Sequence, residues 1–325
     1  MPVPDPGLFV MGRSQKAIGL FFLVLLTSAG SLPAAENFHL SIFSNIALNN
    51  GQINEIVFPA ETTDNPYFSR LEWQLRNVVL LGLGVRIRFL EKFSFQTSVY
   101  SNLSTGFGLM ENYDWKSPSS SDHTHYSKSN AILDNLGSWQ VDSTLSYEFL
   151  TISYFSFAGG LGFNFQRWSF HDELVSYKYP ASVGNSLDSF IGKTTVNYTV
   201  LYFFPQVLLS LAFTYKRFGA QLLLSYGFLA LTDATDYHEA RDIRFRDSIF
   251  PGNYLNAGLT TFFQATKVIR INLGLSYRAI LENRGYTVIE NQAAAENRVL
   301  ENRSGNSGEW FNIELGVEFS VWRNP

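Results

Sequence analysis

The sequence of 325 residues contains no cysteine. This absence excludes disulfide bonds, thiolate metal sites, a cysteine nucleophile and a lipoprotein anchor on an N-terminal cysteine. Charged residues are scarce, at 16%, and the net charge is −4. With no basic cluster in the chain, nothing points to nucleic acid as a partner. Beyond the first 35 residues, no apolar run is long enough for a transmembrane helix.

Aromatic side chains, in contrast, are abundant: 29 Phe and 16 Tyr. Aromatic enrichment without long apolar runs suits β-strands better than helices. The composition therefore favours an all-β protein.

The N-terminal segment has the pattern of a secretory signal peptide. Arg13 and Lys16 precede the short apolar stretch "AIGLFFLVLLTSAG", and two alanines end the segment before Glu36. We expect 1–35 to be removed, with Met11 as an alternative start because the preceding "MPVPDPGLFV" does not fit the pattern. The mature chain, 36–325, is then expected outside the cytoplasm.

Alternation with a period of two residues recurs along the mature chain. In "KVIRINLGLSYRAIL" (267–281) and "EWFNIELGVEFSVW" (309–322), apolar side chains interleave with polar ones. Successive strand side chains point to opposite faces, so each strand has an apolar and a polar face. Charged residues such as Arg270 and Glu318 are expected on the polar face, inside a lumen where opposite signs can pair.

A soluble sandwich also alternates, but two features favour a membrane barrel. The alternating segments are commonly about ten residues or longer, which suits tilted membrane strands. Tyr and Trp near strand ends, and an aromatic last strand, suit the interfacial girdles of such barrels.

The pattern predicts a transmembrane antiparallel β-barrel of about ten strands in 36–325. Short turns are expected near residues 90, 150, 216 and 266, and long polar loops at 50–69, 110–135, 171–193, 237–252 and 287–308. Short periplasmic turns and long extracellular loops are typical of outer-membrane barrels. A barrel this narrow is filled by side chains, which argues against a general porin.

Two short stretches could carry chemistry. In "LTDATDYHEARD" (231–242), Asp236 and His238 share a face of an extended chain, and a carboxylate can orient an imidazole as a general base. A chance loop pair would give the same spacing, and the apolar pattern leaves open which face points inward. In "LMENYDWKS" (109–117), Asn112 and Asp114 likewise share a face. "DHTH" (122–125) resembles a metal pair, but its Ser-rich context favours a solvated loop, so we expect no metal site.

Together these stretches resemble the omptins, a family of outer-membrane aspartyl-type endopeptidases. "MENYDW" (110–115) is similar to the family's M-x-D-x-D-W and "SRLEWQLRN" (69–77) to its S-x-L-D-W-x-x-x-N stretch. "GQINE" (51–55) is similar to its glycine-led segment ending in glutamate. "GFNFQRWSF" (162–170) is similar to its lipid-binding strand, and the match runs through most of the mature chain.

The resemblance implies a peptidase site at the extracellular mouth of the barrel. His238 would activate a water molecule, oriented by Asp236, across a groove from Asp114 and Asn112. Omptins cut between basic residues, and Glu55 matches the acid that holds the basic side chain before the cut. The partners implied are peptide or protein substrates.

The resemblance also implies contact with lipopolysaccharide, on which omptins depend for activity. Arg167 matches one phosphate-binding position, whereas the other family positions read Phe165, Leu201 and Phe250. No other cofactor is expected.

Further departures affect the site itself. Asn112 replaces the first family aspartate, and an amide keeps the size of a carboxylate but loses its charge. The acid two residues before Asp236 is Ala234, with Asp233 one step away as the remaining substrate-binding candidate. The alternatives are a catalytically impaired or inactive barrel that acts as an adhesin or surface-binding protein, and a small transport or structural barrel.

Overall fold

The structure is a computed structural model, and it describes residues 38–60, 65–116, 122–180, 187–291 and 296–323. The expected signal peptide, 1–35, lies outside the described residues. Among the described residues, no helix has the length and apolar character needed to cross a membrane.

The described chain is almost entirely β-structure, with one short 3₁₀ helix at Asp188–Phe190. The strands are β1 (His39–Val57), β2 (Ser69–Phe89), β3 (Phe93–Asn102), β4 (Gly108–Asp114), β5 (His125–Leu133), β6 (Trp139–Ile152), β7 (Phe155–Lys178), β8 (Val196–Tyr215), β9 (Phe218–His238), β10 (Ile243–Gln264), β11 (Ile269–Asn291) and β12 (Glu296–Arg323).

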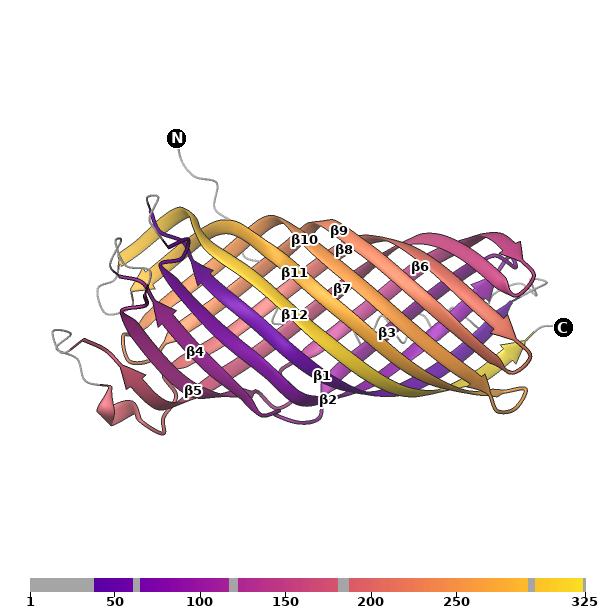
Figure 1. The fold of residues 1–325 in the computed structure, drawn as a ribbon, viewed down its shortest axis with the longest axis horizontal. Coiled ribbons are helices and arrows are strands. Elements are labelled where there is room, and N and C mark those ends of the chain that lie inside the picture. The colour runs from indigo at the N-terminus through magenta and orange to yellow at the C-terminus, as the bar shows by residue number, and fades with distance from the viewer. Residues whose placement is uncertain (1–37, 61–64, 117–121, 181–186, 292–295, 324–325) are drawn as a thin grey trace.

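These strands form one antiparallel sheet that closes on itself, since β1 pairs with both β12 and β2. β3 and β4 both pair with β2, and β5 and β6 both pair with β7, so twelve strands occupy ten positions around the barrel. The expectation of about ten strands is confirmed. His39 pairs with both Arg88 and Arg323, so the barrel begins and ends at the short-turn end. In Figure 1 the strands wind obliquely around the barrel, with β4 and β5 at the opposite end.

The expected long loops are mostly strand. β1 continues to Val57, β7 to Lys178 and β11 to Asn291, and β10 begins at Ile243. The reason is length: about twenty tilted residues span roughly 50 Å, twice the ~25 Å apolar band of a membrane barrel. Half of each long strand therefore extends beyond the bilayer, where its outer face mixes polar and apolar residues and the strict alternation is lost.

The outer face of the other half carries the apolar band. Its exposed residues include Ile46, Leu83, Leu145, Leu161, Leu209, Leu224, Leu255, Leu273 and Leu315. Inside the barrel at this level, charges pair as the alternation predicts. Arg86 and Arg270 lie 2.7 and 3.7 Å from Oε2 of Glu318, and Arg278 lies 3.1 Å from Oδ2 of Asp142.

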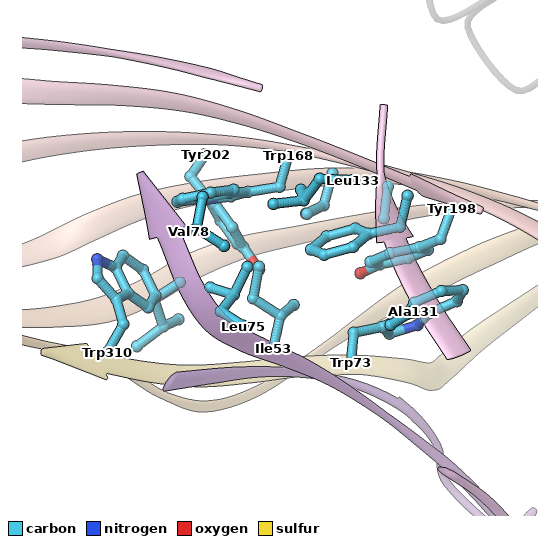
Figure 2. Packing of buried hydrophobic residues seen from close by; sticks show 14 of the residues in the cluster. Ile53, Trp73, Leu75, Val78, Ala131, Leu133, Trp168, Tyr198, Tyr202 and Trp310 are labelled. Atoms are coloured by element: carbon cyan, nitrogen blue, oxygen red, sulfur yellow. The ribbon is translucent and has the colours of Figure 1, made fainter. Parts of the chain in front are cut away.

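Above this network the interior is filled by an apolar core, part of which is shown in Figure 2. Trp73 stacks on Tyr198 with ring centroids 5.4 Å apart, and Phe170 packs against both rings. Trp168 and Trp310 meet edge to face. The core closes the lumen and forms the floor on which the extracellular end of the barrel is built.

Candidate active site

The site begins where β9 leaves the core. Thr232, Ala234 and Asp236 are buried and alternate with the exposed Leu231 and Asp233, so the even-numbered residues point inward. This alternation settles the question that the sequence left open. Nε2 of His238 lies 2.6 Å from Oδ2 of Asp236, which is 2% exposed. The predicted pair therefore exists and faces the barrel interior.

The second ring nitrogen of His238 is also engaged. The Arg241 guanidinium, which can only donate hydrogen bonds, contacts Nδ1. Nδ1 therefore accepts, and a neutral imidazole must carry its proton on Nε2, directed at Asp236. Phe245 packs edge to face against the ring, with centroids 5.3 Å apart. These contacts fix both the orientation and the tautomer of His238.

Glu55 reaches the same region from β1. The chain approaches closely here: a Cβ on Gly51 would lie 2.1 Å from the carbonyl oxygen of Glu309, so only glycine fits. Ile53 and Glu55 follow on the inward face and are both buried. Burial raises the pKa of Glu55 well above its ordinary value, and repulsion from Asp236 and Asp247 adds to the rise. Among the described groups, none donates a hydrogen bond to Oε2 of Glu55 or Oδ1 of Asp236.

Asp247 is a third acid of this cluster, and sequence reasoning missed it. It lies on β10 directly opposite Ala234, with its inward side chain buried. Burial raises the pKa of Asp247 to about 7, with contributions from Asp236 and Asp233, while the Thr287 hydroxyl acts to lower it. All these groups lie beyond Leu231, the last exposed apolar residue before them on β9, and hence in the part of the barrel outside the membrane.

Asn112 and Asp114 lie on β4, separated from β9 by the positions of β5, β7 and β8. Asp114 is buried on the inward face, and its Oδ2 lies 3.5 Å from Nζ of Lys116. Oδ1 of Asn112 accepts a hydrogen bond from Oγ of Ser69 at 3.4 Å.

Tyr179, just after β7, connects the two sides of the site. Burial raises the pKa of its phenol, Asp114 raises it further, and Arg241 lowers it. The pKa of Tyr179 is thus influenced both by the Asp114 carboxylate on β4 and by the Arg241 guanidinium that contacts His238. Its ring also meets that of His125 edge to face, with centroids 4.8 Å apart.

Two predicted residues do not join this group. Asp233 lies on the outer face of β9, since it alternates with the inward Thr232 and Ala234. Arg167 is on the outer face of β7, and its Nη1 donates to the carbonyl oxygen of Gly137. Phe165, Leu201 and Phe250 follow the outward alternation of their strands, and Phe250 is exposed.

The "DHTH" stretch leads into β5, which begins at His125. His123 packs outward against Tyr113, Trp115 and Tyr126, whereas His125 is buried on the inward face. Within the described ranges, no group of His, Asp and Glu is arranged to hold a metal ion.

Sequence reasoning missed Asp247 and Arg241, and it considered His125 only as part of the metal-like "DHTH" stretch. Asp247 and Arg241 fall in 237–252, which the alternation assigned to a loop. Asp247 could have been predicted by counting residues outward from the turn of the β9–β10 hairpin, which places it opposite Ala234.

The fold and the site define a class: a ten-position β-barrel with an apolar outer band, a filled lumen, and an acid–histidine cluster at the end away from the turns. The family model described as "Omptin family" matches residues 36–321. The chain belongs to this family, and it is an outer-membrane barrel with its site on the extracellular face.

Individual relatives are distant in sequence but match over most of their length. The chain is 22% identical over 304 residues to "Outer membrane protease IcsP" of Shigella flexneri, covering 88% of this chain and 93% of that protein. It is 19% identical over 317 residues to "Plasminogen activator" of Yersinia pestis, covering 94% and 99%. The crystal structure of the outer membrane protease OmpT from Escherichia coli matches with a TM-score of 0.77 at 17% identity, covering 90% and 99%.

Proposed function

We propose that the protein is an endopeptidase that hydrolyses peptide bonds next to basic residues at the extracellular mouth of the barrel. The observation that carries the proposal is the 2.6 Å contact between Nε2 of His238 and Oδ2 of Asp236 on the inward face. Family membership and the protease among the relatives support the same reaction class.

The tautomer of His238 defines a mechanism. With Nε2–H directed at Asp236, the basic lone pair is on Nδ1, which Arg241 holds until the guanidinium moves aside. A water molecule at Nδ1 gives its proton to the imidazole, and its oxygen attacks the peptide carbonyl carbon. The carbonyl π electrons move to the oxygen, and the tetrahedral intermediate collapses as the leaving amine takes the proton from the imidazolium. Asp236 stabilises that imidazolium, as a buried carboxylate does.

The acid cluster supports selection of a basic side chain. Asp236 and Asp247 lie close enough to the buried Glu55 to raise its pKa, Asp236 likewise raises the pKa of Asp247, and Oε2 of Glu55 has no donor among the described groups. Like charges held together in a dry site are stabilised by a bound cation. Glu55 and Asp247 would bind the guanidinium or ammonium group, leaving Asp236 to orient His238.

Lipopolysaccharide is the proposed lipid partner, and Arg167 the proposed phosphate ligand. Its place on the outer wall supports this role. Activity should rise when the purified barrel is supplied with lipopolysaccharide, and Arg167→Ala should weaken that stimulation without changing cleavage at saturating lipid.

The proposal is tested with purified protein, supplied with lipopolysaccharide, and a peptide library containing basic pairs. The expected products end at or begin with Lys or Arg, and the same library should stay intact with His238→Ala. A protein that cuts nothing in the library would instead support the surface-binding alternative.

A further inference from the structure

A second imidazole, His125, lies on the inward face of the barrel. It pairs with Asp114 in the β4–β5 ladder, and it is 5% exposed. β5 is separated from β9 by the positions of β7 and β8, so His125 and His238 enter the barrel from strands three positions apart. Among the described groups, none hydrogen-bonds its buried Nε2.

Thr124 determines which nitrogen of His125 carries the proton. Its Oγ1 accepts from the backbone N–H of Lys116 at 3.1 Å and donates to the carbonyl oxygen of Asp114 at 3.1 Å. Nδ1 of His125 lies 2.9 Å from the same Oγ1. A hydroxyl has one proton and two lone pairs, so this network is complete when Nδ1–H donates to Oγ1. Nε2 is then left with a lone pair and no partner.

The surroundings keep this imidazole neutral. Burial lowers the pKa of His125, and the Lys116 ammonium lowers it further, while Asp114 acts in the opposite direction. The imidazole also meets the ring of Tyr179, which comes from the segment after β7 and is part of no strand. A substrate that displaces Tyr179 would expose Nε2 to the site.

We propose that His125 is a water-binding residue of the same site, and that its Nε2 accepts a hydrogen bond from the water that His238 deprotonates. The proposal rests on the proposed function. It adds an acceptor on β5 to those of β4, where Asn112 is a neutral amide whose Oδ1 accepts from Ser69. With one O–H directed at His238 and the other at His125, the oxygen lone pair is left facing the carbonyl carbon.

The experiment compares kcat, KM and their pH profiles for the wild type, His125→Gln and His171→Gln in lipopolysaccharide. His171 is the matched control, because it pairs with Asp134 on the outer face. In His125→Gln we expect kcat to fall about 100-fold, KM to stay within about twofold, and the low-pH limb of the kcat profile to change shape. His171→Gln should match the wild type.

A second variant and a spectroscopic measurement guard against a folding defect. Thr124→Val keeps the imidazole but removes its orienting acceptor, so kcat should fall about 10-fold in a barrel with unchanged circular dichroism. In ¹⁵N-histidine spectra, the neutral ring of His125 should carry its proton on Nδ1.

The outcomes separate the two claims. If the wild type cleaves, His238→Ala does not, and His125→Gln keeps wild-type kcat and pH profile, His125 has no such role and the peptidase assignment stands. A proton on Nε2 of His125 would also overturn the inference. If the wild type cleaves nothing, the proposed function fails and the role of His125 fails with it.

Discussion

Asp247 lies directly opposite Ala234 across the β9–β10 ladder, so a carboxylate from one strand reaches the place where the neighbouring strand offers only a methyl group. The family resemblance implies an acid at position 234 of β9, and the acid found at this level of the ladder is on β10 instead. Asp247 and Ala234 are well separated in the sequence, so only the pairing of β9 with β10 shows that they are neighbours.

Replacement of Asp247 by Asn should weaken binding of basic substrates. Loss of one charge next to Glu55 is expected to raise KM about tenfold for a peptide with Arg at the cleavage site, roughly 1.4 kcal/mol, with a smaller change in kcat. Steady-state kinetics on matched Arg and norleucine peptides measure this. Asp233→Asn is the matched control: it removes the same charge from the outer face and should leave KM unchanged, and the reverse ranking would contradict the assignment.

The pH dependence follows from the same residue. With its pKa raised to about 7, Asp247 is neutral below pH 7 and charged above it. KM for the Arg peptide should therefore fall as the pH rises from 6 to 8, and this step should be absent in Asp247→Asn.

Asp247→Asn should also stabilise the folded barrel at alkaline pH. The folded-state pKa, about 7, lies above the ordinary 3.8, so the folded state holds this proton more tightly than the unfolded state. The carboxyl group therefore lowers stability progressively as the pH rises from about 4 to 7. Thermal unfolding at pH 5 and pH 8 tests this. The variant should gain more stability over the wild type at pH 8 than at pH 5, and an equal gain at both pH values would refute the cause.

Replacement of Asn112 by Asp should increase the rate of cleavage. An aspartate keeps the contact with Oγ of Ser69 and adds a charge that holds water and supports proton transfer. We expect kcat to rise about tenfold with little change in KM. Glu111→Gln, on the outer face of the same strand, serves as the control. A fall in kcat for Asn112→Asp would show that the site is adapted to the amide.

The aromatic floor should carry much of the stability of the extracellular half. Trp73 is fully buried and stacks on Tyr198, so Trp73→Ala should cost about 3–5 kcal/mol in unfolding free energy. Phe163→Ala, on the lipid-facing side, should cost less than half as much, because its ring is already exposed to lipid. Denaturant titrations of refolded barrels compare the two, and equal losses would show that the lumen is not close-packed.

The apolar band makes most of the barrel predictable. Where one face meets lipid and the other a polar lumen, side chains alternate strictly, as in β11 and β12. The pattern fails above the membrane, because both faces of the strand become mixed there. For this reason the sequence predicts a loop at 237–252, although β10 begins at Ile243. It likewise predicts a loop at 110–135, where the structure has most of the short strand β4 and all of β5.

The site was predictable only in part. Asp236 and His238 lie two residues apart, so local geometry alone places them on one face. The sequence does not show whether that face points inward. Ala230 and Ala234 point into the lumen beside bulky aromatic residues, so odd-numbered and even-numbered positions of β9 both carry apolar residues. Asp247 and His125 enter the site through cross-strand register, which a single sequence does not encode locally.

The most direct test is cleavage by the wild type and by His238→Ala. Both are incubated with a peptide containing one Arg–Arg pair, in lipopolysaccharide, and the products are identified by mass spectrometry. The account predicts a single cut at the pair by the wild type and a loss of at least about 100-fold in His238→Ala with its fold intact. Equal cleavage by the two proteins, or none by the wild type, would contradict it.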